Sequence, residues 1–225
     1  MVSNTAARAK RALPLRARKD EDKEARRRLL LDEALALYQD TSYAEVKMAD
    51  VAERARLAKG TVFLYFPTKE ALFLALLEDL LFAWFEKLDG LLRAPGPWTG
   101  TRLARTVVES LEGEEALTRL LAVLQTVLEH NVTVEQARRF KERLLEAQLR
   151  AGARAESLLP FLKPGEGPRL LLHLHALVTG LRQMADVAPV THEVLSLPHM
   201  APLKVDFSTE LEAALTTLLR GLESR

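Results

Sequence analysis

A short stretch of the chain, Lys59 to Tyr65, brings together side chains that suit contact with a polyanion. The ammonium of Lys59 attracts phosphate groups, and Gly60 allows close approach because it has no side chain. The hydroxyl of Thr61 can hydrogen-bond either a phosphate or the edge of a base. These residue types favour binding over catalysis.

The other residues that could do chemistry form no catalytic or metal-binding pattern. The chain has no cysteine, which excludes disulfides, cysteine zinc sites and thiol nucleophiles. His173 and His175 would lie about 200° apart around a helix, so they cannot share a metal. Lys59-Gly60-Thr61 has the order Lys-Gly, not the Gly-Lys of a phosphate loop, and no Glu-x-x-His or Gly-x-Ser-x-Gly motif occurs. The sequence therefore predicts that the protein is not an enzyme and uses neither a metal nor a cofactor.

Two short helices must position these side chains. Apolar spacing predicts the first over about Lys47–Ala55 and the second over about Lys59–Phe66, joined by the tight turn Arg56–Ala58. Pro67 ends the second helix because it lacks an N–H, and Thr68 is placed to cap a new helix. Two short helices around such a turn, with a longer helix on either side, form a helix-turn-helix.

Helical spacing continues through the rest of the chain, so the predicted fold class is all-α. One helix over about Glu24–Asp40 precedes the motif. A long helix over Ala71–Leu92 follows it, apolar nearly all round and therefore expected to be buried on several sides. The Pro-containing segment Ala188–Val205 separates the last two predicted helices. The remaining predicted helices span about Thr101–Leu111, Glu114–Glu129, Val134–Leu158 (with a capping box of Thr133 and Gln136), Arg169–Ala185 and Phe207–Leu222.

Charge is distributed unevenly along the chain. Residues 1–69 contain 15 Lys and Arg against 10 Asp and Glu, whereas the remainder contains 17 against 21. A basic first third on an acidic body suggests a polyanion partner for the first part only. Residues 1–19 hold several Lys and Arg and no acidic residue, which fits either a solvated flexible tail or an arm that lies along nucleic-acid phosphates.

The location follows from the apolar segments. The basic N-terminus has no apolar block after it, which argues against a signal peptide. The longest apolar run, Ala71–Phe85, is interrupted by Glu78-Asp79 and is too short to cross a bilayer. We expect a cytoplasmic protein with no membrane partner.

The segment Ala49–Glu78, ADVAERARLAKGTVFLYFPTKEALFLALLE, closely resembles the DNA-binding domain of TetR-family (TetR/AcrR-type) transcriptional regulators. The similarity extends back through Leu29–Tyr43 as the family's first helix. The resemblance implies an all-helical homodimer that binds an inverted-repeat operator on double-stranded DNA and is usually released by a small ligand. Together with the basic composition of the N-terminus, this gives three expected parts: a basic, flexible arm over residues 1–22, a helix-turn-helix DNA-binding domain over residues 23–69, and a helical ligand-binding and dimerisation domain over residues 70–225.

The same resemblance assigns DNA contacts to individual residues. Gly60 and Thr61 would lie at the floor of the major groove, Lys59 and Tyr65 at phosphates, and Lys69 at the backbone from the start of the next helix. The full set of expected DNA-binding residues is Lys47, Lys59, Gly60, Thr61, Phe63, Leu64, Tyr65 and Lys69.

Several positions depart from the family pattern. Arg56 stands where a turn glycine is usual, so a left-handed conformation there would cost about 1–2 kcal/mol. Ala58 replaces the usual Ser or Thr cap of the second helix, which costs about 1 kcal/mol and removes a phosphate donor. Phe63 and Leu64 replace residues that are commonly polar, although Leu64 can press on a thymine methyl. Lys47 stands where Ser or Thr often caps the first helix, and as a cation it can contact phosphate.

The body of the chain offers a candidate pocket and a candidate dimer interface. Trp84, Phe85 and Leu88 are consistent with an apolar cavity, and Arg182 could orient an acidic or carbonyl group. By the resemblance, the last two helices pair with their copies in a four-helix interface; the alternative is ordinary core within one chain. The expected interface residues are Leu174, Leu177, Gly180, Leu181, Leu211, Leu215, Leu218 and Leu222.

The sequence thus predicts a dimeric, sequence-specific transcriptional regulator, a repressor that a small apolar ligand releases from its operator. Two other classes fit parts of the pattern: a basic-armed protein that coats DNA without sequence choice, and a helical ligand carrier or enzyme with no DNA role. A change at Thr61 separates the first two classes, because only sequence-specific binding depends on it. The pattern leaves open the effector, the operator, the choice between repression and activation, and the role of the arm.

Overall fold

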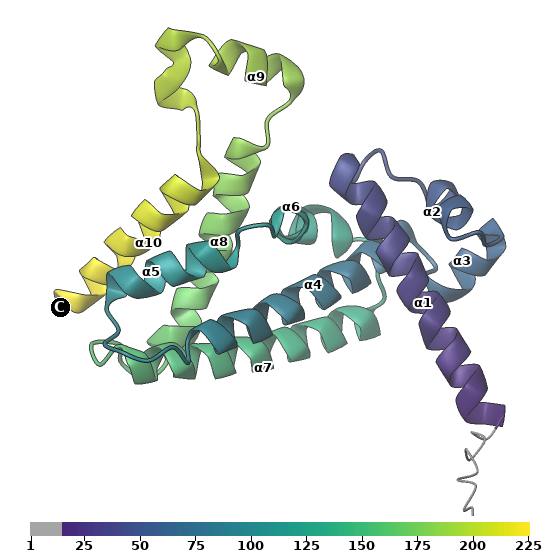
Figure 1. Cartoon of the computed structure of the whole chain (residues 1–225), viewed down its shortest axis with the longest axis horizontal. Coiled ribbons are helices and arrows are strands. Elements are labelled where there is room, and N and C mark those ends of the chain that lie inside the picture. The colour runs from purple at the N-terminus through teal and green to yellow at the C-terminus, as the bar shows by residue number, and fades with distance from the viewer. Residues whose placement is uncertain (1–14) are drawn as a thin grey trace, which may run out of the picture.

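The structure, a computed structural model, describes residues 15–225, and every regular element in that range is helical. The predicted all-α fold is therefore confirmed. Residues 1–14, which hold most of the predicted basic arm, lie outside the described residues. The elements in chain order (Figure 1) are α1 (Leu15–Asp40), α2 (Met48–Arg54), α3 (Lys59–Tyr65), α4 (Lys69–Leu91), α5 (Gly100–Ser110), α6 (Glu115–Val123), a π-helical turn η1 (Leu124–Leu128), α7 (Val134–Leu158), α8 (Glu166–Ala185), α9 (Pro189–Leu195), a 3-10 turn η2 (Pro198–Leu203) and α10 (Phe207–Glu223).

An apolar core shared by α1 to α4 holds the helix-turn-helix together. Val51 of α2 and Val62 of α3 are completely buried in it. The Phe73 ring of α4 meets the rings of Tyr38 and Tyr43 edge-on, with centroids 5.4 and 5.0 Å away. Edge-to-face pairs of this kind stabilise a core beyond their buried area. The start of α4 is therefore an integral part of the helix-turn-helix core.

The turn between α2 and α3 has the hydrogen bonds of a Schellman motif. The Leu57 N–H donates to the Ala52 carbonyl at 2.9 Å, and the Arg56 N–H donates to the Glu53 carbonyl at 3.0 Å. Arg56 has a φ of 54°, the only positive value at a non-glycine residue within 15–225. The motif prefers glycine at this position because a Cβ crowds the following carbonyl. Arg56 therefore has the left-handed conformation whose free-energy cost the sequence predicts.

Replacing Arg56 with glycine should stabilise the protein. The change removes about 1–2 kcal/mol of left-handed strain, and the freedom of glycine in the unfolded chain cancels about half of that gain. We expect a net gain of about 0.5–1 kcal/mol, or roughly 2 °C in melting temperature by calorimetry. Arg54→Gly is the matched control, because Arg54 is helical and pairs with Glu33 at 2.8 Å. That control should lower the melting temperature, and shifts of the same sign in both variants would contradict the account.

Helix α4 connects the helix-turn-helix to the body of the protein. It leaves the motif and runs beside α7, while α8 packs on α6, α7 and α10, and α5 packs on α10 (Figure 1). In the body, the Trp84 Nε1–H of α4 donates to the Ser110 hydroxyl of α5 at 2.9 Å. The burial predicted for several sides of this helix is confirmed, because α4 packs on α1 in the motif and on α5, α6 and α7 in the body.

Helices α7 and α8 cross so closely that only glycine fits at the contact. A Cβ on Gly152 would lie 2.5 Å from Cδ of Pro168, and a Cβ on Gly167 would lie 2.5 Å from the carbonyl carbon of Gly152. The two glycines lie on different helices and no sequence pattern marked them, so the crossing was not predicted from the sequence. The space around Gly180, by contrast, is open within this chain.

The first helix begins earlier than predicted. The flexible arm was expected to continue to residue 22, but α1 starts at Leu15. This start follows from composition, because Arg, Ala, Lys and Glu between Leu15 and Arg28 are good helix formers. Arg28 further fixes the helix with ion pairs to Asp32 at 3.2 Å and to Asp79 of α4 at 3.1 Å. The boundary of the arm is corrected accordingly.

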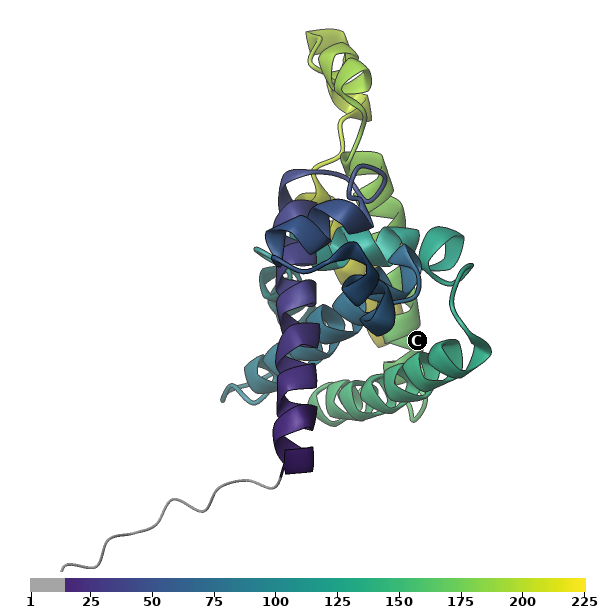
Figure 2. The same ribbon diagram turned by 90° about the vertical axis from the view of Figure 1, so that its right-hand side faces the viewer.

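The Pro-containing segment before α10 also holds helical turns, α9 and η2, that the sequence did not reveal. Pro189 and Pro198 stand at the first turns of these elements, where the missing N–H of proline has no intrahelical partner to lose. The segment rises above the body (Figures 1 and 2).

The single helix predicted over Glu114–Glu129 is likewise divided into α6 and η1. No helix within residues 15–225 is long and apolar enough to cross a bilayer.

Candidate nucleic-acid interface and ligand cavity

Helix α3 turns one face to the core and the opposite face to solvent. Val62 and Phe66 are buried toward α2, whereas the Leu64 side chain is 83% exposed. This division follows the predicted periodicity, because residues four apart share a face. The exposed residues of the outer face are Lys59, Gly60, Phe63 and Leu64, with Thr61 and Tyr65 half-buried at its edges.

Gly60 lies in open space within α3. A Cβ built on Gly60 meets no atom within 4 Å, and its backbone is not among the left-handed residues. The fold therefore does not require glycine here, and glycine in a helix costs about 1 kcal/mol relative to alanine. A partner surface that approaches the backbone closely would require it.

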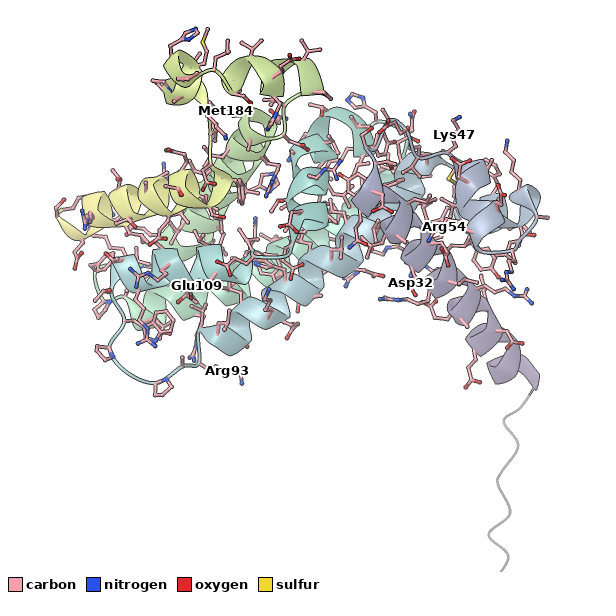
Figure 3. The ribbon with its side chains drawn as sticks, turned by 45° about the horizontal axis from the view of Figure 1, so that its top comes forward. Asp32, Lys47, Arg54, Arg93, Glu109 and Met184 are labelled. Carbon is pink, nitrogen blue, oxygen red and sulfur yellow. The ribbon has the colours of Figure 1, made fainter. Side chains whose placement is uncertain are left out.

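The two helices of the motif begin without side-chain caps. Lys47 precedes α2 and Ala58 precedes α3, and neither side chain accepts a hydrogen bond from the first turn. Thr68, by contrast, accepts from the Ala71 N–H at 3.0 Å at the start of α4, as predicted. Lys47 is exposed and projects from the surface of the motif (Figure 3). Its side chain is therefore accessible to a phosphate.

Lys69 is half-buried and bonded within the chain. Its Nζ donates to the carbonyl of Tyr43 and, at 3.4 Å, to that of Ala44, and it lies 4.2 Å from the centre of the Tyr43 ring. Burial lowers the pKa of Lys69. Lys69 thus holds the α1–α2 loop at the start of α4, and its contact with the DNA backbone stays a prediction.

Arg119 of α6 joins the end of the first helix to the body. Its guanidinium donates to the carbonyls of Tyr38 at 3.3 Å and Thr41 at 2.7 Å, and it pairs with Asp186 after α8 at 3.2 Å. The same group lies 4.7 Å from the centre of the Tyr38 ring, and burial raises the pKa of Tyr38 to about 12. No local sequence pattern marks Arg119, because its partners are distant in the chain.

A second joint lies at the start of α4. The Thr68 hydroxyl donates to the Asn131 carbonyl at 3.0 Å, and the Asn131 amide donates to Glu70 at 3.2 Å. Asn131 belongs to the loop between η1 and α7, so the body contacts the helix that begins directly after the recognition motif. Movement of either α4 or α6 would therefore act on the helix-turn-helix.

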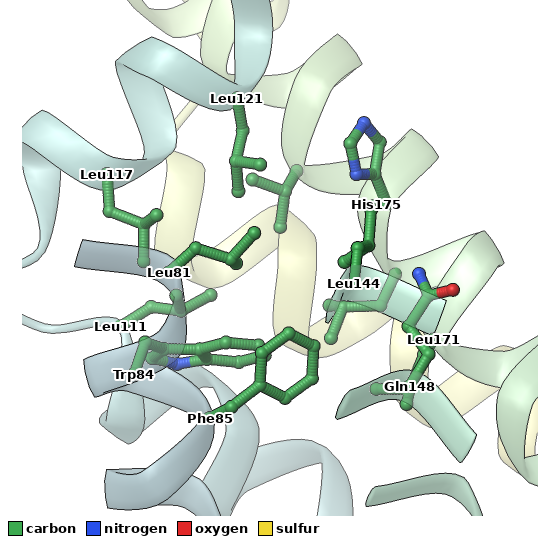
Figure 4. Close-up of a pocket in the computed structure, with 12 residues that line it drawn as sticks. Leu81, Trp84, Phe85, Leu111, Leu117, Leu121, Leu144, Gln148, Leu171 and His175 are labelled. Atoms are coloured by element: carbon green, nitrogen blue, oxygen red, sulfur yellow. The ribbon is translucent and has the colours of Figure 1, made fainter. Parts of the chain in front are cut away.

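A mainly apolar cavity of about 40 Å³ lies between α4, α6, α7 and α8. Trp84 and Phe85, two of the predicted pocket residues, line it. Leu88 lines a separate apolar cavity of about 30 Å³. Arg182 lines neither cavity, and its guanidinium lies 4.0 Å from the centre of the Phe207 ring. The lining residues of the larger cavity (Figure 4) are Leu81, Trp84, Phe85, Leu111, Leu117, Leu121, Leu144, Gln148, Leu171, Leu174, His175 and Val178.

Three of the expected interface residues belong to the core of the single chain. Leu174, Leu211 and Leu215 are at most 5% exposed, so they cannot contribute appreciable area to a contact between copies. The prediction is corrected for these three, because an apolar stripe does not show which of its residues meet the chain's own helices. The other five, Leu177, Gly180, Leu181, Leu218 and Leu222, remain half-buried.

A helix-turn-helix with an exposed second helix, joined through one long helix to an all-helical body with a cavity, defines a DNA-binding regulator with an appended helical domain. Comparison with known families identifies both parts. Residues 30–76 match the bacterial regulatory proteins of the tetR family, and residues 78–225 match the tetracyclin repressor-like C-terminal domain. The chain belongs to the TetR family of transcription regulators, which are not enzymes.

The similarity to curated relatives covers less than a third of the chain. The transcriptional repressor KstR of Rhodococcus jostii (strain RHA1) is 44% identical over 64 residues, which is 28% of this chain and 28% of that protein. KstR of Mycolicibacterium smegmatis is 41% identical over 69 residues, or 31% of this chain and 32% of that protein. The matched region thus spans less than a third of either relative.

Solved structures resemble the whole chain at low sequence identity. The fatty acid degradation regulator FadR of Bacillus halodurans has a TM-score of 0.56 and 16% identity, covering 87% of this chain and 95% of that one. A TetR-family regulator from Syntrophomonas wolfei has a TM-score of 0.56 and 16% identity, covering 90% and 97%. At this identity the likeness shows the fold alone.

Proposed function

We propose that this protein is a homodimeric repressor that binds an inverted-repeat operator and leaves it when a small apolar molecule enters the body cavity. The main support for this proposal is the outer face of α3. It presents Lys59, the Thr61 hydroxyl, and Gly60 with open space beside its backbone. Lysine attracts phosphate, and the hydroxyl can read a base edge. Repression would follow from occupying promoter DNA, in the cytoplasm of a bacterial cell.

The surfaces of α8 and α10 support the dimer. Leu177 and Leu181 of α8 and Leu218 and Leu222 of α10 are half-buried leucines on two helices that pack on each other. Gly180 lies on α8 with no atom of its own chain within 4 Å of a built Cβ, which leaves room for a second helix. A two-fold dimer places two copies of α3 on one side of DNA, as an inverted repeat requires.

The double variant Leu177→Glu, Leu218→Glu should make the protein monomeric at micromolar concentration. Two buried carboxylates facing their copies would cost several kcal/mol, and operator affinity should fall because each monomer holds only one half-site. Light scattering after size exclusion measures the mass. Leu149→Glu, which changes an exposed leucine of α7, is the control and should remain dimeric. A double variant that keeps the dimer mass would show that the interface lies elsewhere.

Ligand binding in the cavity can change the position of the recognition helix α3 through the helices that line the cavity. The cavity is lined by α4 and α6, the two helices that hold the helix-turn-helix through Thr68 and Arg119. A molecule larger than the cavity must move these helices to fit. Such movement would change the spacing of the two α3 helices and weaken binding to the inverted repeat.

Selection of bound fragments from the source genome by the purified protein tests the regulator directly. We expect an enriched inverted repeat near physiological salt. Thr61→Val, which removes the hydroxyl and keeps the shape, should relax the preference at one operator position by about 1–3 kcal/mol. Fragments without a common sequence, and no effect of Thr61→Val, would favour the DNA-coating alternative.

A further inference from the structure

We propose that the effector is an apolar molecule with one uncharged hydrogen-bonding group at its end, and that Gln148 and His175 bind this group. The inference rests on the proposed function, because it takes the cavity between α4, α6, α7 and α8 to be the effector site. The inference adds the chemical class of the effector and the orientation of the effector in the cavity. It is based on the difference in polarity between the two walls of the cavity.

The wall formed by α4 and α6 accepts only apolar groups. Leu81, Phe85, Leu117 and Leu121 offer no hydrogen bond. Trp84 has a single N–H donor, and that donor is already bonded to the Ser110 hydroxyl at 2.9 Å. The indole therefore presents only its apolar ring to the cavity, so the apolar part of a ligand belongs on this side (Figure 4).

The opposite wall carries the two polar lining residues, Gln148 of α7 and His175 of α8 (Figure 4). The amide nitrogen of Gln125 lies 3.1 Å from Nε2 of His175. The amide can only donate, so Nε2 accepts and Nδ1 carries the proton of the neutral ring. Among the described side chains, the His175 ring is hydrogen-bonded through Nε2. Both His175 and Gln148 are half-buried, so Nδ1–H and the Gln148 amide are available to a ligand oxygen.

The cavity excludes a charged end group. No Lys, Arg, Asp or Glu lines it, and the nearby Lys141 and Glu129 pair with each other. Burial lowers the pKa of His175, and Lys141 adds to the effect against the opposing Glu129. The imidazole is therefore neutral near pH 7, and a carboxylate or ammonium would enter without a counter-charge, which is unfavourable. Alcohols, ketones and esters remain as the class of effector.

Trp84 reports binding directly in the full-length protein. The chain has two tryptophans, and Trp98→Phe leaves Trp84 as the only one. Hexan-1-ol, hexanoate and hexylamine share one apolar chain and differ in end group, and each is titrated while Trp84 fluorescence is recorded. We expect hexan-1-ol to bind at least about tenfold tighter than either charged compound. Equal or tighter binding of hexanoate or hexylamine, or no response to hexan-1-ol, would overturn the inference.

A second comparison tests the two polar residues. In Gln148→Leu, His175→Leu the preference for hexan-1-ol over hexane should disappear, while hexane binds at least as well as before. His173→Leu, on the same helix but not among the lining residues, is the matched control and should keep the preference. An unchanged preference in the double variant would refute the assignment. Release of the protein from its operator is measured separately. If hexan-1-ol binds as expected but does not release the operator, the proposed function is contradicted and this inference is not.

Discussion

Gly60→Leu should abolish operator binding and leave the fold intact. The added side chain has free space in the unbound protein, because a Cβ at this position meets no atom within 4 Å. Leucine also favours a helix over glycine by about 0.8 kcal/mol, so the melting temperature should rise slightly. Against DNA the side chain would hold the α3 backbone away from the groove. We expect a loss of at least about 100-fold in affinity, equal to roughly 3 kcal/mol.

Gly90→Leu is the matched control for this variant. Gly90 is an exposed glycine inside α4, also with no atom within 4 Å of a built Cβ. Its replacement should raise stability by a similar amount and leave operator affinity unchanged in an anisotropy titration at fixed salt. If Gly60→Leu binds the operator as tightly as the wild type, α3 does not approach DNA with this face.

Gly152→Ala should produce the largest loss of stability among the changes considered. The methyl group would lie 2.5 Å from Cδ of Pro168 and equally close to backbone atoms of α8, and backbone cannot rotate away as a flexible side chain can. Overpacking of this kind costs about 1–3 kcal/mol. For a chain of this length we expect a decrease of about 4–10 °C in melting temperature. Gly90→Ala, in open space, should instead increase it.

The same crossing bears on ligand binding. Gln148 of α7 and Leu171 of α8 lie close to the contact along their helices, and both line the cavity. Separating α7 from α8 would therefore move Gln148 away from His175 and reduce the preference for hexan-1-ol over hexane in the Trp84 titration. Gly152→Ala that melts like the wild type would show that the two helices can move apart at little cost.

The helix-turn-helix could be predicted from the sequence because local interactions determine it. Pro67 ends α3 through its missing N–H, Thr68 caps α4, and Val62 and Phe66 share the buried face by helical spacing. Each of these effects acts within a few residues. The left-handed strain at Arg56 also followed from position in the turn. The start of α1 was placed too late, since charged residues were read as a flexible arm although they form helices well.

Distant contacts explain what could not be predicted. Lys69 was expected at DNA, and its bonds to two carbonyls of the α1–α2 loop were not predicted. Leu211 and Leu215 carry the same apolar signal as Leu218, and only the packing of α5 and α8 on α10 separates core from surface. The sequence by itself therefore determined the helices, the helix-turn-helix motif and the family resemblance, because residue spacing and turn chemistry act locally. Tertiary structure decided which apolar faces remain open, where the cavity lies, and which polar groups face it, because these depend on helices that meet from far apart in the chain.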